Sequence, residues 1–234
     1  MNDILGQALL DYQNGNYTED ILTETNISEE DVLPLPYLFR DFDEMPSIEK
    51  KALKLTQGKV LDVGCGAGSH SLFLQKKGFD VMAIDTSKGA IKVCKLRGIN
   101  HALQINLLEL KEVTFDTILL LMNGTGIFQK IEQIDKYLLH LKSLLKPNGQ
   151  ILIDSSDLRY MYDSTEEGAI LVPNNRYYGE LEFVMKYKNK SSHPFNWLYL
   201  DENIFESAAT NCNLNFKVVE RGDNYDYLTK LTFF

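Results

Sequence analysis

The fold is decided by residues 60–74, VLDVGCGAGSHSLFL, where a buried apolar strand runs into a turn with three glycines. Asp62, Gly64, Gly66 and Gly68 form the pattern D-x-G-x-G-x-G, and an amphipathic helix is predicted over residues 69–77. Glycines at alternate positions let the backbone turn tightly and approach a ligand with no Cβ in the way. The stretch therefore predicts a strand, a ligand-binding loop and a helix.

The spacing of the glycines separates two classes of ligand. Dinucleotide-binding oxidoreductases carry G-x-G-x-x-G, with the third glycine five places after the first. Here the third glycine comes four places after Gly64, and position 69 is serine. Asp62 would also repel a pyrophosphate, because like charges in close contact are unfavourable. An NAD-linked oxidoreductase is therefore an alternative that the loop supports poorly.

The rest of the chain extends this unit into a layered α/β fold. Strands are expected at 59–63, 79–84, 102–105, 115–122 and 150–153, separated by helices at 69–77, 87–96 and 131–145, the last ending at Pro147-Asn148-Gly149. Continuous apolar strands between helices indicate a parallel sheet covered on both faces. This predicts an α/β, doubly wound, mostly parallel sheet, with ligands at the carboxyl ends of its strands.

The final third of the chain changes character. Strands at 177–188 and 195–200 are expected to form a small antiparallel β insertion within residues 155–200, followed by a helix at 202–210. Strands at 215–220 and 227–234 then close the main sheet as a terminal antiparallel hairpin, which makes seven strands in all. Residues 51–234 are accordingly predicted to form one domain.

Three stretches resemble the class I S-adenosylmethionine (SAM)-dependent methyltransferase family, in its small-molecule-type or uncharacterised bacterial branch. They are residues 60–74, FDTILLLMNGTGIF at 115–128 and LLKPNGQILID at 144–154. The resemblance covers residues 58–154 well and the last 30 residues weakly. It implies a Rossmann-like methyltransferase fold, SAM as cofactor and transfer of its methyl group by in-line displacement. The fourth strand ends in Met122-Asn123-Gly124. This ending differs from the N/D-P-P-Y/F signature of enzymes that methylate amino groups of DNA or protein glutamine.

The resemblance also implies which residues bind SAM. The methionyl part would lie on the glycine loop and the ribose on Asp85, which follows Gly64 by 21 residues. The adenine would lie at Asn106, where the family often has an acid; an amide oxygen can accept the same bond, although a turn-forming asparagine is the alternative. The full set of predicted cofactor-binding residues is Asp62, Gly64, Cys65, Gly66, Gly68, Asp85, Thr86, Asn106, Leu107, Met122 and Asn123.

Candidate catalytic residues follow the fifth strand and lie in the insertion. In-line methyl transfer depends on positioning, and a general base is required only when the acceptor starts protonated. Asp154, Asp157 and His193 are the candidates, with turn capping or solvated loop positions as the alternatives. A SAM-binding protein without turnover therefore remains a second alternative. Aromatic residues of the insertion form either an acceptor pocket or apolar packing; they are Tyr160, Tyr162, Tyr177, Tyr178 and Trp197.

Charge is distributed unevenly along the chain. Residues 1–50 hold 12 acids and 2 bases, whereas the remainder holds 21 acids and 22 bases, within a total net charge of −9. The N-terminal 50 residues are predicted to be an acidic, helical segment that caps the cleft. Arg40 is expected to pair with a neighbouring acid, or instead to hold an anionic acceptor if the segment folds over the cleft. No basic face is visible, which argues against nucleic acid as a partner and favours a small-molecule acceptor.

The cysteines, the apolar runs and the N-terminal residues indicate in which cellular compartment the protein is expected. Three cysteines without a CxxC pair favour a reducing compartment and argue against a structural metal site. The longest apolar runs are too short to span a bilayer, and the N-terminus lacks the basic start of a secretory signal. A cytoplasmic protein without a membrane partner is expected, and no feature of the sequence indicates an oligomeric state.

Overall fold

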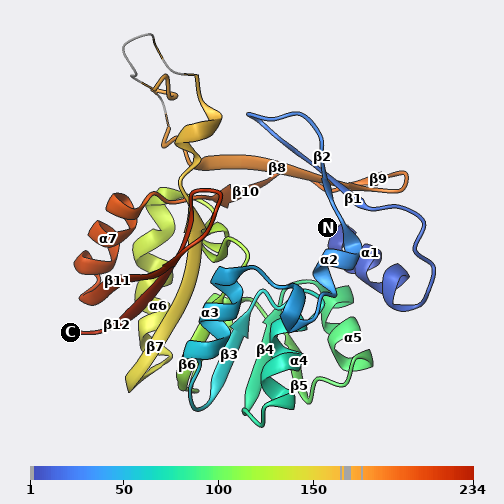
Figure 1. Cartoon of the computed structure of the whole chain (residues 1–234), viewed down its shortest axis with the longest axis horizontal. Helices are drawn as coiled ribbons and strands as arrows, with labels where there is room; N and C mark the ends of the chain where they lie inside the picture. Colours follow the sequence, from blue (N-terminus) through green and yellow to red (C-terminus); the bar gives the residue numbers. More distant parts are fainter. Residues whose placement is uncertain (1–2, 164, 166–169, 175) are drawn as a thin grey trace.

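A computed structural model describes residues 3–163, 165, 170–174 and 176–234. Two sheets organise the chain (Figure 1): a seven-stranded sheet with helices in the lower part of the view, and a five-stranded sheet that runs across the top. The latter is called the roof sheet below. Residues 164, 166–169 and 175 of the predicted insertion lie outside the described residues.

The larger sheet has the order β11-β12-β7-β6-β3-β4-β5. Pairing is parallel from β7 through β5, and antiparallel for β12 with β7 and with β11. The doubly wound sheet and its terminal hairpin are therefore confirmed. The strands are β3 (Val60–Val63), β4 (Val81–Asp85), β5 (His101–Gln104), β6 (Phe115–Leu120), β7 (Leu145–Ser156), β11 (Leu214–Arg221) and β12 (Asp226–Phe233).

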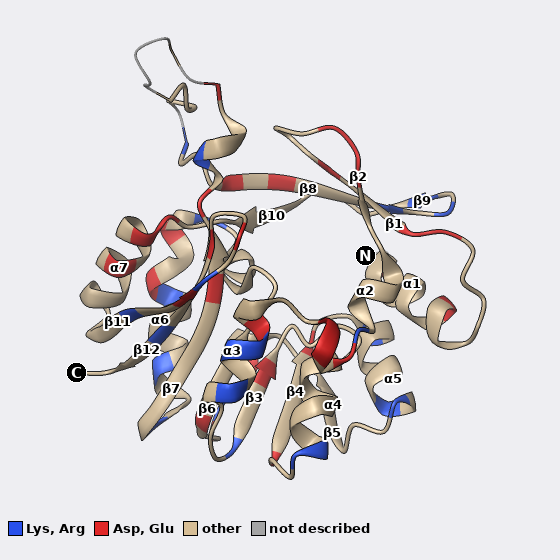
Figure 2. Cartoon of the chain, in the orientation of Figure 1, with Lys and Arg blue, Asp and Glu red and all other residues tan. Residues whose placement is uncertain are grey.

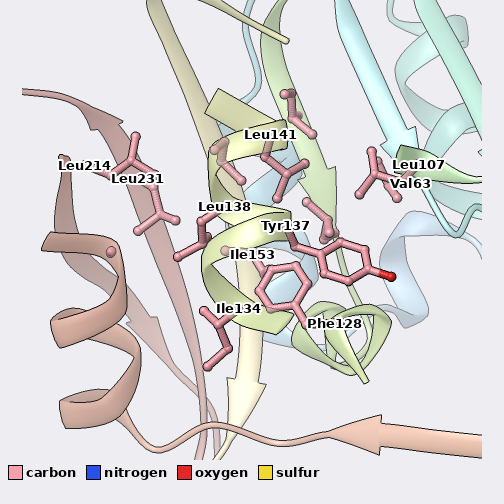
Figure 3. Close-up of a cluster of buried hydrophobic side chains, with 14 of the residues drawn as sticks. Val63, Leu107, Phe128, Ile134, Tyr137, Leu138, Leu141, Ile153, Leu214 and Leu231 are labelled. Carbon is pink, nitrogen blue, oxygen red and sulfur yellow. The ribbon is translucent and has the colours of Figure 1, made fainter. Parts of the chain in front are cut away.

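Both faces of this sheet are buried under helices. On one face, Ile134, Leu138 and Leu141 pack towards Ile153 of β7 (Figure 3), and Phe205 belongs to the same core. On the other face, the buried residues Leu53 and Leu74 share a core with Leu119 and Leu152. Burial on both faces explains why the central strands are almost entirely apolar. The helices are α3 (Ser47–Leu55), α4 (Ser69–Lys76), α5 (Lys88–Leu96), α6 (Ile134–Ser143) and α7 (Glu202–Asn211).

The predicted turn at residues 147–149 lies inside β7. This strand begins at Leu145, which pairs with Phe115, and the pairing then shifts so that Gln150 faces Thr117. Leu145 and Phe115 are both buried, so their packing extends the strand across the proline and the glycine as an irregularity. As a consequence Asp154, expected just after the fifth strand, lies within β7.

The roof sheet contains the two predicted insertion strands and three strands that were not predicted. Its order is β10-β8-β1-β2, with β9 paired to β8, and every pairing is antiparallel. The expectation of a helical N-terminal segment was therefore wrong for β1 and β2. Ile21 of β1 is fully buried, and Leu22 faces Lys186 of β8. The roof strands are β1 (Ile21–Thr25), β2 (Asp31–Leu33), β8 (Glu180–Tyr187), β9 (Lys190–Ser191) and β10 (Phe195–Leu198).

The N-terminal segment also contains α1 (Ile4–Gln13) and α2 (Leu35–Leu38). Helix α1 lies so close to α5 that a Cβ on Gly89 would meet the Gly6 backbone at 2.4 Å. The Asp3 carboxylate accepts hydrogen bonds from the Ser87 hydroxyl (2.7 Å) and the Gly89 N–H (2.8 Å). The segment is thereby fixed to the N-terminus of α5, directly after the end of β4.

Within the described part of the chain, every helix falls short of the length and apolar character needed to cross a bilayer.

Candidate functional site

The glycine loop between β3 and α4 leaves open space on one side. Gly64, Gly66 and Gly68 all have positive φ, at 71°, 53° and 81°. A Cβ on Gly66 would meet no atom within 4 Å, whereas a Cβ on Gly68 would lie 2.3 Å from Ile99. Gly68 is therefore required by packing against the end of α5. Gly66 has no such neighbour, and its backbone borders free space.

Asp62 fixes the loop from within the protein. Its side chain is 2% exposed and accepts a hydrogen bond of 2.6 Å from the Ser71 hydroxyl in α4. Burial raises the pKa of this carboxyl above its ordinary value. The bond ties β3 to the first turn of α4 and so holds both ends of the glycine loop.

Asp85 is brought next to Gly66 at the end of β4. One carboxylate oxygen accepts from the Gly66 N–H (3.0 Å) and the other from the Ser87 N–H (2.8 Å). The residue is 9% exposed, and burial raises its pKa. Each oxygen retains a lone pair after these bonds. The predicted ribose-binding acid and the glycine loop therefore form one hydrogen-bonded unit.

Cys65 and Thr86, which follow Gly64 and Asp85, offer a ligand fewer side-chain contacts. The Cys65 thiol is buried, 3.7 Å from the Cys94 thiol of α5, and Cys94 and burial together hold the pKa of Cys65 well above its usual value. Only the backbone of Cys65 is thus left to face a cofactor. Thr86 is exposed, and its carbonyl oxygen accepts from the Gln104 amide (3.1 Å).

The predicted adenine position is formed by a turn. The Asn106 amide oxygen accepts from the Leu108 N–H (2.9 Å) and caps the short 3-10 helix Leu107–Glu109. Asn106 is exposed, while Leu107 is 4% exposed and belongs to the main core. The Asn106 side chain therefore forms this turn, and its amide oxygen retains one lone pair for a further hydrogen bond.

The turn after β6 is held in place by Asp154. Met122 and Asn123 have φ of 67° and 58°, and the N–H groups of Asn123 and Gly124 donate to separate oxygens of the Asp154 carboxylate at 3.0 and 2.8 Å. The Asn123 amide donates in turn to the Leu198 carbonyl at the end of β10 (3.2 Å). This turn thus connects the main sheet to the roof sheet.

Asp154 is expected to titrate at a higher pH than an ordinary carboxyl group. It is 7% exposed, and burial raises its pKa to about 6 from an ordinary 3.8. Because the unfolded chain ionises at the lower pKa, Asp154 lowers stability as pH rises from about 4 to about 6, by on the order of 3 kcal/mol. A carboxyl-carbon NMR titration measures the pKa of Asp154 directly. A midpoint near 4 would contradict the environment described here.

The other two catalytic candidates do not join Asp154. Asp157 accepts hydrogen bonds from the Arg159 side chain (2.7 Å) and the Tyr178 hydroxyl (3.0 Å). Burial would raise the pKa of Asp157, but these bonds outweigh it and lower the pKa. His193 is exposed between β9 and β10 and makes no hydrogen bond or ion pair with any described residue.

A buried charge network adjoins the glycine loop, and most of it was not predicted from the sequence. Arg40, as expected, pairs with an acid, Glu49, whose other oxygen lies 2.7 Å from His70 Nε2. These three side chains are at most 8% exposed. The Arg40 guanidinium lies 3.9 Å from the centre of the Tyr37 ring. In the sequence, the one indication that His70 belongs to this network is its position two residues after Gly68.

The N-terminal segment contacts the loop directly as well. The Ser69 hydroxyl at the start of α4 donates to the Leu38 carbonyl (3.0 Å), and Arg97 donates to the Ala67 carbonyl (2.6 Å) and the Phe39 carbonyl (3.4 Å). Residues 35–49 therefore lie against the same loop that borders the open space at Gly66.

The predicted aromatic residues have different partners. Trp197 packs on the backbone of Gly126, where a Cβ would meet its ring at 2.0 Å. The Tyr177 hydroxyl donates to Asp201 at 2.7 Å, and the Tyr178 hydroxyl lies 3.1 Å from the same carboxylate oxygen. Tyr160 and Tyr162 line a pocket of about 360 Å³ at the end of β7. Trp197 therefore has a packing role, whereas Tyr160 and Tyr162 border a cavity.

Comparison with known proteins supports a methyl-transfer site. A family model described as a methyltransferase domain matches residues 55–208. A SAM-dependent methyltransferase from Bacteroides fragilis, whose crystal structure contains S-adenosyl-L-homocysteine (SAH), is 40% identical with a TM-score of 0.92. The match covers 99% of this chain and 94% of that one.

More distant relatives differ in the atom that they methylate. A ubiquinone biosynthesis O-methyltransferase of Rickettsia typhi is 25% identical over 164 residues, covering 68% of this chain and only 61% of the relative. The sugar N-methyltransferase KedS8 from Streptoalloteichus is 12% identical with a TM-score of 0.58, covering 83% of this chain and 88% of that one. The latter likeness shows the fold alone.

Proposed function

The chain belongs to the class I SAM-dependent methyltransferase family, and we propose that it transfers a methyl group from SAM, bound on the glycine loop, to a small-molecule acceptor held between Asn123 and the roof sheet. The observation that carries the assignment is the open space beside Gly66, next to the buried carboxylate of Asp85. SAM would supply a methyl carbon activated by the sulfonium.

The residues present fit this cofactor. A side chain at position 66 would occupy the free space, so glycine keeps room for the methionyl part. Asp85 accepts one N–H on each oxygen and can still accept the ribose hydroxyls. Met122 and Asn123 would lie at the methyl group, because the turn after β6 forms at the carboxyl edge of the sheet.

We assign any proton transfer to Asp154 in preference to Asp157 and His193. Asp154 contacts the turn that would hold the reacting atoms, and its pKa of about 6 is close to the pH at which a base is effective. Asp157 is neutralised by Arg159, and no described residue orients His193. Asp154 would then both position Asn123 and accept a proton.

Calorimetric titration with SAM, SAH and NAD tests the proposal. SAM and SAH are expected to bind, and NAD is expected not to bind. Binding of NAD without SAM would restore the oxidoreductase alternative. Tight SAH binding with no methyl transfer across a broad acceptor panel would instead identify a SAM-binding protein without turnover.

Replacement of Asp85 by alanine is expected to weaken SAM binding by about 1–3 kcal/mol, which is roughly five- to 150-fold in affinity. The variant loses the charge-assisted bonds to ribose and frees the Gly66 N–H. Asp80, an exposed acid before the start of β4, provides the control as Asp80→Ala. Equal SAM affinities for the two variants would contradict the ribose-binding role.

A further inference from the structure

One face of strands β8 and β10 of the roof sheet gathers aromatic side chains. Phe183 of β8 pairs with Phe195 of β10, and Leu181 pairs with Trp197. Because side chains alternate between the two faces of a strand, these four lie on the same face. The Tyr199 ring, directly after β10, stacks with the Phe183 ring at a centroid distance of 6.4 Å. We call Phe183, Phe195, Trp197 and Tyr199 the aromatic wall.

Both ends of this face rest on the main domain. At one end, Trp197 packs on the backbone of Gly126 in the turn after β6. At the other end, Tyr187 lies on the same face of β8, is 2% exposed and shares a core with Ala90 of α5. The face therefore spans the carboxyl edge of the main sheet from β6 to β4, as β8 does in Figure 1.

The rings of the aromatic wall touch one another but join no core. Phe195 lies 6.0 Å from Phe183 and 6.2 Å from Trp197, measured between ring centroids. All four rings are half-buried, and none belongs to a hydrophobic cluster of the described residues. The rings of Phe195 and Tyr199 lie within 24° of parallel to that of Phe183. The wall thus presents a nearly flat aromatic surface.

The aromatic wall adjoins the turn where the methyl group is expected. Asn123 donates from its side chain to the carbonyl of Leu198, which precedes Tyr199 in the chain. Burial raises the pKa of Tyr199, and the nearby carboxylate of Asp154 raises it further, which agrees with this position. Hydrogen bonds and packing therefore connect the wall to both sides of the turn.

Charged side chains are absent from the aromatic wall. The charged residues of β8 occupy the alternate positions and so lie on its opposite face; they are Glu180, Glu182 and Lys186. Lys186 pairs there with Glu24 and Glu30 of the N-terminal segment. Strand β10 contains no charged residue (Figure 2). The wall itself therefore offers a ligand ring faces, without a fixed charge of either sign.

Building on the proposed function, we propose that the acceptor is an uncharged aromatic compound whose ring stacks on Phe183, Phe195 and Tyr199. Aromatic pairs gain energy beyond the burial of their area, and a flat surface matches a planar ring. A saturated ring, such as that of a sugar, would lose this gain. An anion would find no cation on the wall, and a cation is held best where several ring faces surround it.

The transfer balances for such an acceptor. A lone pair of the acceptor atom attacks the methyl carbon of SAM, and the carbon–sulfur bond breaks with its electron pair remaining on sulfur. Where the acceptor atom carries a proton, the proton passes to Asp154 and then to water. The products are SAH and the methylated aromatic compound.

Four probes of similar size separate the classes of acceptor, each titrated by NMR into the SAH-saturated protein. They are 2-naphthol, decahydro-2-naphthol, decahydro-2-naphthylamine and 2-naphthoate. We expect 2-naphthol to bind about three- to tenfold more tightly than each of the others. Equal or tighter binding of any other probe would overturn the inference, and so would failure of 2-naphthol to bind.

Two variants locate the binding. Phe183→Leu and Phe195→Leu keep an apolar side chain but remove a ring, so each should weaken 2-naphthol about three- to tenfold and leave decahydro-2-naphthol unchanged. Phe234→Leu, at an exposed aromatic far along the chain from the wall, is the control. Losses no larger than that of the control would overturn the assignment to this wall.

A measurement on the wild type does not depend on the folding of any variant. With SAH and 2-naphthol bound, intermolecular NOEs are expected between the naphthol protons and the ring protons of Phe183 and Phe195. Bound 2-naphthol without these NOEs would contradict the proposed position.

SAH titration distinguishes failure of the proposed function from failure of the acceptor assignment. If SAH does not bind, the proposed function fails and the aromatic acceptor fails with it. If SAH binds but 2-naphthol shows no preference over the other probes, only the aromatic acceptor is lost.

Discussion

Replacing Gly66 by asparagine is expected to abolish SAM binding while the protein remains folded. Asparagine tolerates the positive φ of 53° at this position better than other side chains with a Cβ. Its side chain would extend into the space where a Cβ meets no protein atom within 4 Å. The fold is therefore not disturbed by a clash, and the cofactor loses the room that it needs.

A matched control comes from Gly78, after α4. It also has a positive φ, 89°, and a Cβ there would likewise meet nothing within 4 Å. Gly78→Asn should bind SAH like the wild type in calorimetry, and both variants should unfold at similar temperatures. Retention of SAH affinity by Gly66→Asn would show that the cofactor does not lie against this loop.

Replacing Glu49 by glutamine is expected to lower the free energy of unfolding by about 3–5 kcal/mol. Arg40 is 4% exposed and would keep a buried charge without its partner. The bond to His70 would also lose its charged acceptor. Burial would raise the pKa of Glu49, but His70 and Arg40 outweigh it and lower the pKa. The stabilisation is therefore present at neutral pH and is lost as pH falls below about 4.

The exposed pair Arg221–Glu202 provides the comparison. Its side chains are 63% and 34% exposed, so Glu202→Gln should change stability by only about 0–1 kcal/mol. Urea denaturation at pH 7 of both variants measures the difference. Equal losses would mean that the Arg40–Glu49–His70 network adds no more than a surface pair.

The main sheet was predictable because its strands are buried on both faces. Runs such as VLDV in β3 read as nearly continuous apolar segments, and the helix expected from residue 87 is α5, which Ser87 caps. The carboxyl edge of the sheet then brought Asp85 and Gly66 together, as the strand order requires.

The roof sheet and the charge network were harder to predict for a common reason. Strand β1 reads ILTET, with only Ile21 buried, and its partner β8 is far away in the sequence. Short, half-polar strands are recognised only through the partner that they meet. Glu49 likewise lies in an ordinary amphipathic helix, and nothing near it in the sequence indicates that His70 will be its neighbour.

The pairing of β1 with β8 also determines when the roof sheet can form during folding. The Glu182 N–H donates to the Asn26 side chain, 156 residues away, and the Lys188 N–H donates to Glu19 across 169 residues. Closing such long loops is slow compared with forming neighbouring parallel strands. During synthesis, residues 21–33 must wait for β8 to leave the ribosome. The parallel strands β3 to β6, which carry the glycine loop, are therefore expected to pair before β1 pairs with β8.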